Sequence, residues 1–481
     1  MAIDEVKKFI AQRDLDAATR YVPPVVTPTR AGGFDQKIAI IGAGPAGLSC
    51  AFYLAEKGYK PVVFEKNERP GGMLTYGIPS FKLEKDVIEA EVEVIRLMGA
   101  EFRYGVEVGR DVTLDELRAQ GFKAFYVAIG CQGGRLAGIP GEGAEDVTVA
   151  VDFLREVNSG KIDSLSGRTI VVGGGNVAID VARNACRLGS EHVEMFCLES
   201  DAQMPASEEE RREAIEDGAH ISCGWGPKEI HLDEAGRVCG ITFKRCTRVF
   251  DDEGRFAPEY DENDLRRVDA DRVVMSIGQS IVWGDLLAGS KVELGRGQGA
   301  LADPQTYQTA EPDIFVGGDV YTGPSFAIDA IAAGHEAAVS IHRFVQPGST
   351  LTIGRNQRRY TALDRDDVVI ESYDNASREV AHVDREREKA APFSEYVETF
   401  TEEQVRAETA RCLGCGASIV DPNKCIGCGL CTTKCAFDAI HLHRERPECS
   451  KMYACEDKMK AILPYMIKRE FKIKRAARKS K

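Results

Sequence analysis

The sequence lacks any apolar run of the roughly 18 residues that a membrane-spanning helix needs. Its first ten residues contain acids and no apolar core of a secretion signal. Basic residues are in deficit, since 62 Lys and Arg against 76 Asp and Glu give a formal net charge of −14. These absences argue against a membrane protein and against a general binder of nucleic acid or anionic lipid. We therefore expect a cytoplasmic protein.

Residues 1–345 contain no Cys-x-x-Cys pair, although seven of the fifteen cysteines are scattered before residue 250. This absence argues against a thiol–disulfide relay in that region. None of the eight histidines lies in a motif that would assign it to acid–base work. We therefore assign no catalytic side chain and expect bound cofactors to carry the chemistry.

Residues 37–66 read as a strand, a glycine-rich turn, a helix and a second strand. Gly42, Gly44 and Gly47 form a G-x-G-x-x-G fingerprint directly after an apolar run. Glu65 follows Gly42 by 23 residues, at the end of the next apolar run. Such glycines allow a tight turn, close approach of a pyrophosphate and close helix–strand packing, while the acid binds a ribose. The alternative is a plain strand–turn–helix, but strand, spacing and acid together predict a dinucleotide site.

Residues 67–82 are rich in Gly and Pro, which favours a loop whose backbone can approach a flat ligand closely. A surface loop is the alternative. Asp319 follows another buried-strand pattern with two glycines, and a helix is expected to open after Gly323. An acid beside a helix N-terminus suits a polyol chain and an electron-rich ring, although Asp319 could also simply cap the helix.

A second fingerprint begins at Gly173, with Gly175 and with Ala178 in the place of the third glycine, an accepted variant. The next predicted strand ends at Glu199, 26 residues after Gly173. A carboxylate at this position binds a free ribose 2′-OH and repels a 2′-phosphate, so we predict NAD(H) over NADP(H). The alternative is that Glu199 only ends a strand in solvent.

The other eight cysteines are concentrated between Cys412 and Cys455, which in a cytosolic chain favours metal over disulfides. Four of them have the spacing C-x2-C-x2-C-x3-C, which is typical of a 4Fe–4S cluster, with zinc as the competing metal: Cys425, Cys428, Cys431 and Cys435. The remaining four could ligate a second cluster: Cys412, Cys415, Cys449 and Cys455. Since no second complete motif is present, Cys412 and Cys415 could instead be a thiol–disulfide pair.

These patterns predict an α/β fold with two Rossmann-like dinucleotide-binding domains and a small C-terminal ferredoxin-like module. The predicted parts are an N-terminal helix and linker (1–36), a discontinuous first dinucleotide-binding domain (37–145 and 285–345), an NAD(P)H domain (146–284), an extended connector (346–405), the 4Fe–4S module (406–455) and a basic tail (456–481). The tail has ten Lys and Arg against three Asp and Glu, so it is either a solvated end or a docking segment for an acidic redox partner.

Together the motifs resemble the FAD/NAD(P)-binding core of the glutamate synthase small-subunit family. That family includes related parts of dihydropyrimidine dehydrogenase and of electron-bifurcating NADH-dependent ferredoxin:NADP oxidoreductase. The resemblance covers about two thirds of the chain and rests on residues 42–47, 71–79, 139–142, 173–178, 204–206, 318–319 and 327–338.

The resemblance implies that the first fingerprint holds FAD and the second holds the nicotinamide nucleotide. Glu65 would bind the adenosine ribose, and Asp319 would meet the ribityl chain. The FAD residues predicted in this way are Gly42, Gly44, Pro45, Ala46, Gly47, Glu65, Lys66, Gly72, Met73, Leu74, Gly130, Asp319, Ser325, Phe326 and Ala327. The NAD residues are Gly173, Gly175, Asn176, Val177, Ala178, Glu199 and Gly278.

Two departures from the family matter. NADPH-using members carry an Arg-Arg pair where this chain has Leu198 and Glu199, which strengthens the expectation of NAD(H). The family's cysteine-rich domain usually precedes the FAD fingerprint, whereas no cysteine here precedes Cys50. The motif around Cys412 and Cys415 resembles part of that domain, but its cluster wiring cannot be transferred.

We therefore predict an iron–sulfur flavoprotein oxidoreductase that passes electrons from NADH through FAD to a 4Fe–4S cluster. We expect a hetero-oligomer with iron–sulfur or flavin subunits or ferredoxin, in an electron-bifurcating complex among the options, and no nucleic-acid or membrane partner. An electron-input subunit of a glutamate synthase is one alternative. A structural relay subunit with an idle nicotinamide site is another.

Overall fold

The computed structural model describes most of the chain, with gaps chiefly in its last third. The described residues are 1–27, 34–346, 348–353, 355, 377–412, 425–434, 440–441 and 455–479. They separate into two units, Met1–Gly414 and Cys415–Lys481, each of which is described by itself.

The first parallel sheet is built from early strands and completed by a late one. In sheet order its strands are β15 (Ile314–Val316), β4 (Phe122–Val127), β1 (Lys37–Ile41), β2 (Val62–Glu65) and β3 (Glu101–Tyr104). Alternate residues of the apolar strand β1 point to opposite faces, and each face has its own buried cluster. The sheet is therefore buried on both sides, as parallel sheets are.

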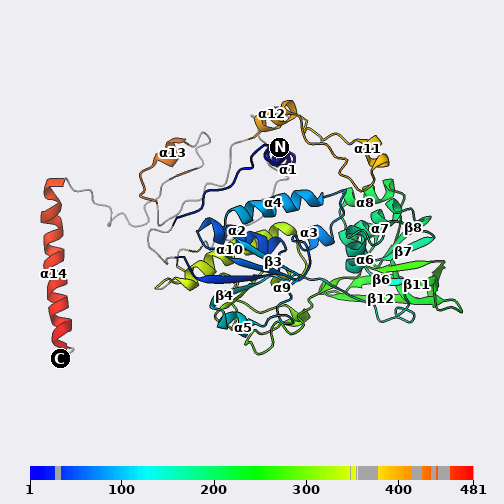
Figure 1. Cartoon of the computed structure of the whole chain (residues 1–481), viewed down its shortest axis with the longest axis horizontal. Helices are drawn as coiled ribbons and strands as arrows, with labels where there is room; N and C mark the ends of the chain where they lie inside the picture. The colour runs from blue at the N-terminus through cyan, green and yellow to red at the C-terminus, as the bar shows by residue number, and fades with distance from the viewer. Residues whose placement is uncertain are drawn as a thin grey trace. The chain divides into compact units, whose positions relative to one another are not determined.

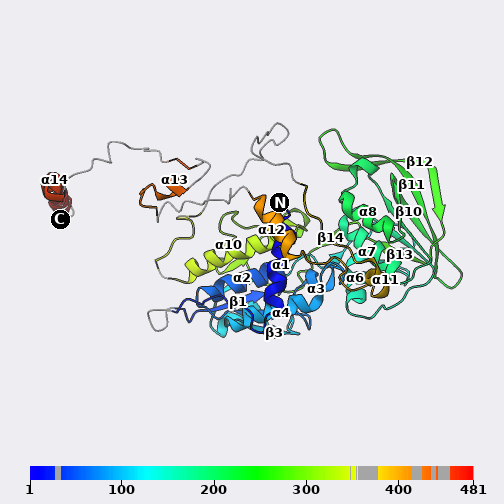
Figure 2. The same cartoon turned by 90° about the horizontal axis from the view of Figure 1, so that it is seen from above.

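Helices cover one face of this sheet, and α10 lies along α2 in both views (Figures 1 and 2). The helices of the domain are α2 (Pro45–Glu56), α3 (Met73–Tyr76), α4 (Lys85–Leu97), α5 (Leu114–Ala119), α9 (Asp319–Thr322) and α10 (Ala327–Val345). Pro45 opens α2, because its fixed φ and missing N–H suit the first position of a helix. The turn before α2 thus aims the N-terminus of that helix at the carboxyl edge of the sheet.

The second parallel sheet repeats this plan. In sheet order its strands are β6 (Val147–Val149), β13 (Arg272–Met275), β7 (Arg168–Val172), β8 (His192–Cys197) and β9 (His220–Cys223). Its helices are α6 (Ala150–Asn158), α7 (Asn176–Arg187) and α8 (Glu208–Glu216). The predicted α/β fold with two Rossmann-like domains is confirmed.

An antiparallel sheet packs against one face of the second parallel sheet. Its strands are β10 (Trp225–Leu232), β11 (Val238–Phe250) and β12 (Phe256–Val268), and the β11–β12 hairpin stands out at one side in Figure 2. Phe243 of β11 stacks on Phe196 of β8 with ring centroids 3.9 Å apart. This contact joins the antiparallel sheet to the core of the parallel one.

Two crossing segments connect the two domains. They are β5 (Gly133–Gly134) and β14 (Gln279–Ser280), which pair with each other as antiparallel strands. The chain therefore leaves the first domain and returns to it through one short two-stranded junction.

Residues 377–412, which cover the end of the predicted connector (346–405) and the start of the predicted 4Fe–4S module, contain short helices rather than only extended chain. They are α11 (Arg385–Ala390) and α12 (Glu402–Ala410). The N-terminal helix α1 (Ile3–Leu15) packs on this segment, where Lys8 Nζ donates to the carbonyl of Val397 at 2.9 Å. Glu408 of α12 is fully buried and accepts a hydrogen bond from the backbone N–H of Ala2 at 2.6 Å.

The second unit contains α13 (Leu430–Lys434) and α14 (Lys458–Lys479), preceded by a 3₁₀ turn at Cys455–Asp457. The predicted basic tail is thus helical over most of its length. Among the described residues, no helix is long and apolar enough to cross a membrane.

Candidate cofactor-binding site

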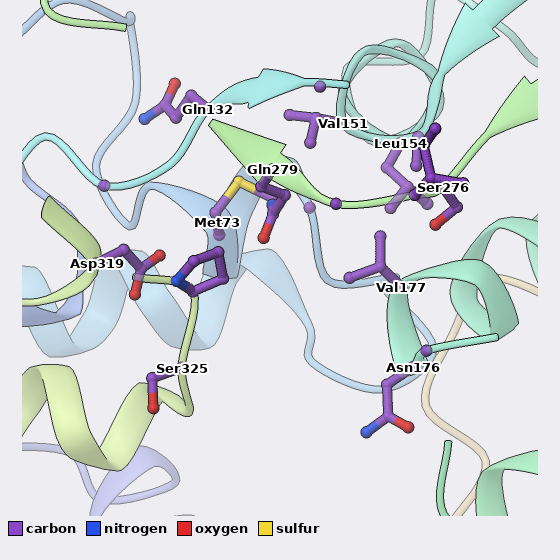
Figure 3. Close-up of a pocket in the computed structure, with 18 of the residues that line it drawn as sticks. Met73, Gln132, Val151, Leu154, Asn176, Val177, Ser276, Gln279, Asp319 and Ser325 are labelled. Atoms are coloured by element: carbon purple, nitrogen blue, oxygen red, sulfur yellow. The ribbon is translucent and has the colours of Figure 1, made fainter. Parts of the chain in front are cut away.

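A single cavity of about 1160 Å³ runs between the carboxyl edges of the two parallel sheets. Both glycine-rich turns open into it, together with residues of the junction between the domains. In Figure 3, Asp319 and Ser325 lie on one side, Asn176 and Val177 lie on the other, and Met73 is between them. Ligands of open α/β sheets bind at this edge, so the geometry suits two dinucleotides meeting in one space.

The first turn is shaped by glycines that no other residue could replace without strain. Gly42 has φ +104°, and a Cβ there would lie 2.4 Å from the carbonyl oxygen of Ala128. The Gly72 loop approaches the turn so closely that its Cβ would lie 3.0 Å from Gly44 Cα. The backbone on this side of the cavity is therefore bare, as a bound pyrophosphate and ring system would require.

Glu65 lies at the end of β2, at the mouth of the first turn. It is 3% exposed, and its carboxylate accepts hydrogen bonds from Ala43 N at 2.8 Å and Asn67 N at 2.9 Å. The Asn67 side-chain amide donates a third bond at 2.7 Å. The carboxylate is thus held in place before any ligand arrives, with Glu65 still lining the cavity.

The loop after β2 is held from behind by a buried amine. Lys85 Nζ donates to the carbonyl of Leu74 at 2.9 Å and also to that of Ile78. Burial lowers the pKa of Lys85 to about 8, with a smaller lowering contribution from Arg69. Asn158 of α6 donates to the carbonyls of Tyr76 and Ile78, each at 3.1 Å, so the second domain also supports this loop.

The second turn is similar but more open. Glu199 lies two residues after the end of β8 and beside Gly174, where a Cβ would lie 3.0 Å from Glu199 Oε2. Glu199 is half-buried, and within the described parts of the chain no hydrogen bond reaches its carboxylate. Gly278 also lines this part of the cavity.

Asp319 faces the same cavity from the N-terminal end of α9. It is partly buried, and this burial raises the pKa of its carboxyl group above the usual range. Three further predicted residues, Ser325, Phe326 and Ala327, follow it at the start of α10 and line the cavity as well.

All the predicted FAD and NAD residues line the cavity except Gly47 and Ala178. These two are the third residues of α2 and α7, within the first turn of each helix, where Ala178 is fully buried. A Cβ at Gly47 would lie 1.9 Å from the carbonyl oxygen of Gly42. Both positions therefore serve close packing of the helix on the turn, and the individual ligand contacts stay predictions.

Sequence reasoning missed several residues of the cavity wall. They are chiefly Asp180 of α7, Trp225 of β10, Lys244 of β11, Tyr260 of β12, and Trp283 in the loop after β14. The strand residues come from the antiparallel sheet, whose polar alternation carries no ligand motif. Asp180 had a detectable signal, because it is an acid inside the apolar helix of the second fingerprint.

The cysteine module can be described only in part. Cys412, Cys425, Cys428 and Cys431 are exposed, and Cys455 begins a 3₁₀ turn. The predicted ligands Cys415, Cys435 and Cys449 lie outside the described residues. Within the described residues no group of three or more metal-ligating side chains comes together. The ligand set therefore stays a prediction, and its donors are the thiolates that iron–sulfur clusters require.

Comparison with known protein families identifies the family of the two-domain core. Residues 36–334 match the model of the pyridine nucleotide-disulphide oxidoreductases. The chain belongs to this family. Residues 418–441 match the 4Fe-4S binding domain, so this flavin-oxidoreductase core is followed by an iron–sulfur domain. The resemblance to glutamate synthase small subunits is confirmed.

Two relatives within the family are similar to this chain over most of its length. The beta subunit of NADP(+)-dependent formate dehydrogenase from Moorella thermoacetica is 34% identical over 86% of this chain and 62% of the relative. The glutamate synthase (NADPH) small chain of Escherichia coli K12 is 34% identical over 72% of this chain and 75% of the relative. The chain thus spans less than two thirds of the first relative, and both relatives are named as parts of larger oxidoreductases.

Solved structures confirm the fold alone. FprA from Mycobacterium tuberculosis in complex with NADPH matches with a TM-score of 0.55 at 19% identity, over 65% of this chain and 85% of that one. Thioredoxin reductase from Lactococcus lactis matches with a TM-score of 0.50 at 20% identity, over 65% of this chain and 99% of that one.

Proposed function

We propose that this chain oxidises NADH, passes the electrons through FAD to a 4Fe–4S cluster, and works as a subunit of a multi-subunit redox complex. The observation that carries the proposal is the shared cavity, into which both dinucleotide turns open. Oxidation of each NADH to NAD⁺ releases two electrons and one proton, and the electrons leave singly through the iron–sulfur domain. When bound, the flavin supplies the exchange between two-electron and one-electron chemistry.

The residues of the first domain would hold and shield the flavin. Glu65 would accept a ribose hydroxyl, the bare backbone at Gly42 and Gly44 would face the pyrophosphate, and Asp319 would meet the ribityl chain. The Gly72–Leu74 loop, supported by Lys85, would lie along the ring system. These groups would bind and orient the flavin and exclude water from it, which is what a protein contributes to cofactor chemistry.

The preference for NADH rests on Glu199. Its carboxylate lies over the second turn, where it would accept a hydrogen bond from a 2′-OH and repel a 2′-phosphate. The names of relatives divide between the two nucleotides, since one relative is an NAD-dependent dihydropyrimidine dehydrogenase subunit from Escherichia coli K12. The preference is therefore argued from this chain's own residue.

Anaerobic mixing of the purified chain with NADH or NADPH tests the proposal. We expect bleaching of the flavin absorbance by both nucleotides, with a higher kcat/KM for NADH. A clear preference for NADPH would contradict the assignment of Glu199. Absence of bleaching by either nucleotide would favour the alternative of a structural relay with an idle nicotinamide site.

Iron and sulfide analysis tests the acceptor side. About four iron atoms per chain would correspond to one cluster and about eight to two. Cys425→Ser should lower the iron content and block NADH-dependent reduction of a one-electron dye while bleaching of the flavin persists. Persistence of full dye reduction would show that electrons leave the flavin by another route.

The identity of the complex is best tested through partner subunits. Purification of the native complex should recover redox subunits with clusters or flavin of their own. Glutamate formation from glutamine and 2-oxoglutarate with a candidate large subunit would instead support the role of electron input to a glutamate synthase, which the 34% identity to a small chain keeps as the second candidate.

A further inference from the structure

The chain crosses between the two dinucleotide domains at the β5–β14 junction, and side-chain contacts elsewhere reinforce the interface between these domains. The loop that follows α3 carries Phe81 and Lys82 from the first domain to helices α7 and α8 of the second. Lys82 Nζ lies 2.6 Å from Asp180 Oδ1 of α7 and also pairs with Glu210 of α8. We call Lys82, Asp180 and Glu210 the interdomain latch.

Phe81 makes the apolar half of the same contact. Its side chain is 2% exposed, and the guanidinium carbons of Arg183 and Arg187 on α7 lie 4.7 Å and 4.2 Å from its ring centroid. Arg183 Nη2 also donates to the hydroxyl of Tyr396 at 2.8 Å, so the connector closes over the contact. Movement of α7 relative to this ring is disfavoured, because both buried guanidinium groups would lose their contact with it.

The charges of the latch are enclosed. Asp180 lines the shared cavity, and its side chain is 14% exposed, against 21% for Lys82 and 23% for Glu210. Burial raises the pKa of Asp180 to about 6, against the opposing effect of Lys82. Burial lowers the pKa of Lys82, but the carboxylates of Asp180 and Glu210 raise it by more, so the pKa is above its usual value. At neutral pH Lys82 and Asp180 therefore form an enclosed ion pair, which is favourable only in a narrow range of geometries.

We propose that Lys82 and Asp180 are positioning residues that hold α7, and with it the nucleotide-binding turn, in one orientation against the flavin loop. The inference rests on the proposed function and adds a role for two residues that are not part of either fingerprint. Asp180 lies about one helical turn after Asn176, where the turn opens into α7. Tying Asp180 to Lys82 thus fixes the pyrophosphate end of the nucleotide relative to Met73 and Leu74.

We expect the latch to affect the rate of electron transfer to the flavin more than the affinity for the nucleotide. Gly173–Gly175 and Glu199 belong to the second domain and move with it, so nucleotide binding does not need the latch. Transfer to the flavin does, because a misplacement of about 1 Å between reacting groups can cost about 100-fold in rate.

Four variants test this proposal: Lys82→Met, Asp180→Asn, the double variant, and Arg103→Met as control. Arg103 forms an exposed ion pair with Glu101 on β3, so its loss removes a pair of similar chemistry away from the domain interface. Each protein is assayed for FAD content, for affinity toward a non-reducing NADH analogue, for the anaerobic rate of flavin bleaching, and for hydrogen exchange of residues 130–136 and 277–282.

We expect FAD content and analogue affinity within about twofold of the parent in every variant. The bleaching rate should fall at least tenfold in each single latch variant and no further in the double, because the two residues act as one unit. Hydrogen exchange at the junction should rise in the same variants and stay at the parental level in Arg103→Met.

Two results would overturn the proposal. One is an unchanged rate with unchanged junction exchange in Asp180→Asn, whose side chain keeps its size. The other is a double variant whose rate loss equals the product of the two single losses. If the parent is not bleached by either nucleotide, the proposed function fails, but junction exchange still reports on the latch.

Discussion

The two dinucleotide turns share a fingerprint, but the acids beside them differ in burial and in hydrogen bonding. Glu65 beside the first turn is 3% exposed and accepts three N–H hydrogen bonds from its own surroundings. Glu199 beside the second turn is half-buried, and no hydrogen bond within the described chain reaches its carboxylate. The first site is therefore organised before its ligand arrives, which suits a cofactor that stays. The second leaves its acid available, which suits a nucleotide that exchanges.

The two fingerprints also differ at the position of the third glycine, which is Gly47 in the first and Ala178 in the second. Gly47 brings α2 so close to its turn that a Cβ would lie 1.9 Å from Gly42 O. Ala178 at the equivalent place is fully buried with its methyl group accommodated. The helix of the first site thus sits closer to its turn, and the contrast between the sites can be tested at matched residues.

The largest effect is expected from Gly47→Ala. The added methyl group must push α2 away from the turn, which should cost about 3 kcal/mol in the free energy of unfolding. FAD should be absent from the purified protein, as measured by flavin absorbance after gel filtration. Retention of stoichiometric FAD would mean that the close approach at Gly47 is not needed for binding.

Glu65→Gln should have the next largest effect. An amide accepts fewer hydrogen bonds than a carboxylate and places an N–H against donors, so we expect a loss of about 2 kcal/mol in stability and partial loss of FAD. Thermal unfolding and FAD content measure both. Glu68→Gln, at an exposed neighbouring position, is the matched control and should leave both unchanged.

Glu199→Gln should leave stability and FAD content unchanged, in contrast to Glu65→Gln. Loss of the negative charge should raise kcat/KM for NADPH relative to NADH about tenfold, which corresponds to about 1.4 kcal/mol. Glu191→Gln, an exposed change before the same strand, is the control. An unchanged nucleotide ratio would remove Glu199 from the recognition of the ribose.

The smallest effect is expected from Ala178→Gly. This change makes the second turn resemble the first in sequence, but the helix does not need the extra space. We expect a loss of about 1 kcal/mol in thermal unfolding experiments, from backbone entropy and lost packing, with nucleotide affinity unchanged. Improved nucleotide binding would show that the buried methyl group limits the second site.

The fold was predictable because local patterns determine it. Apolar strands followed by Gly42 and Gly173 specify strand–turn–helix units, and the fold class built from them is confirmed. The sequence spacing also identified residues that line one cavity in the structure. The fold prediction succeeded because each motif is contained within about 30 residues of chain, whereas the cofactor contacts of the cavity residues stay predictions.

The interdomain latch and the connector were not predictable in the same way. Lys82 and Asp180 are 98 residues apart and meet only because two separate domains dock. Tyr396 reaches Arg183 across 213 positions, in a polar stretch that carries no periodic pattern. Contacts of this kind depend on tertiary packing, which leaves no signature in a local window.

The contact between α1 and α12 has a consequence for the order in which the chain acquires its structure. Helix α1 has 13 residues and no buried residue within its bounds, and an isolated helix of this length is marginal in water. Ala2 meets Glu408 across 406 positions. At about 5–20 residues per second, a ribosome needs roughly 20–80 s to cover that distance. Helix α1 is therefore docked only after a segment about 400 residues further along the chain has been made.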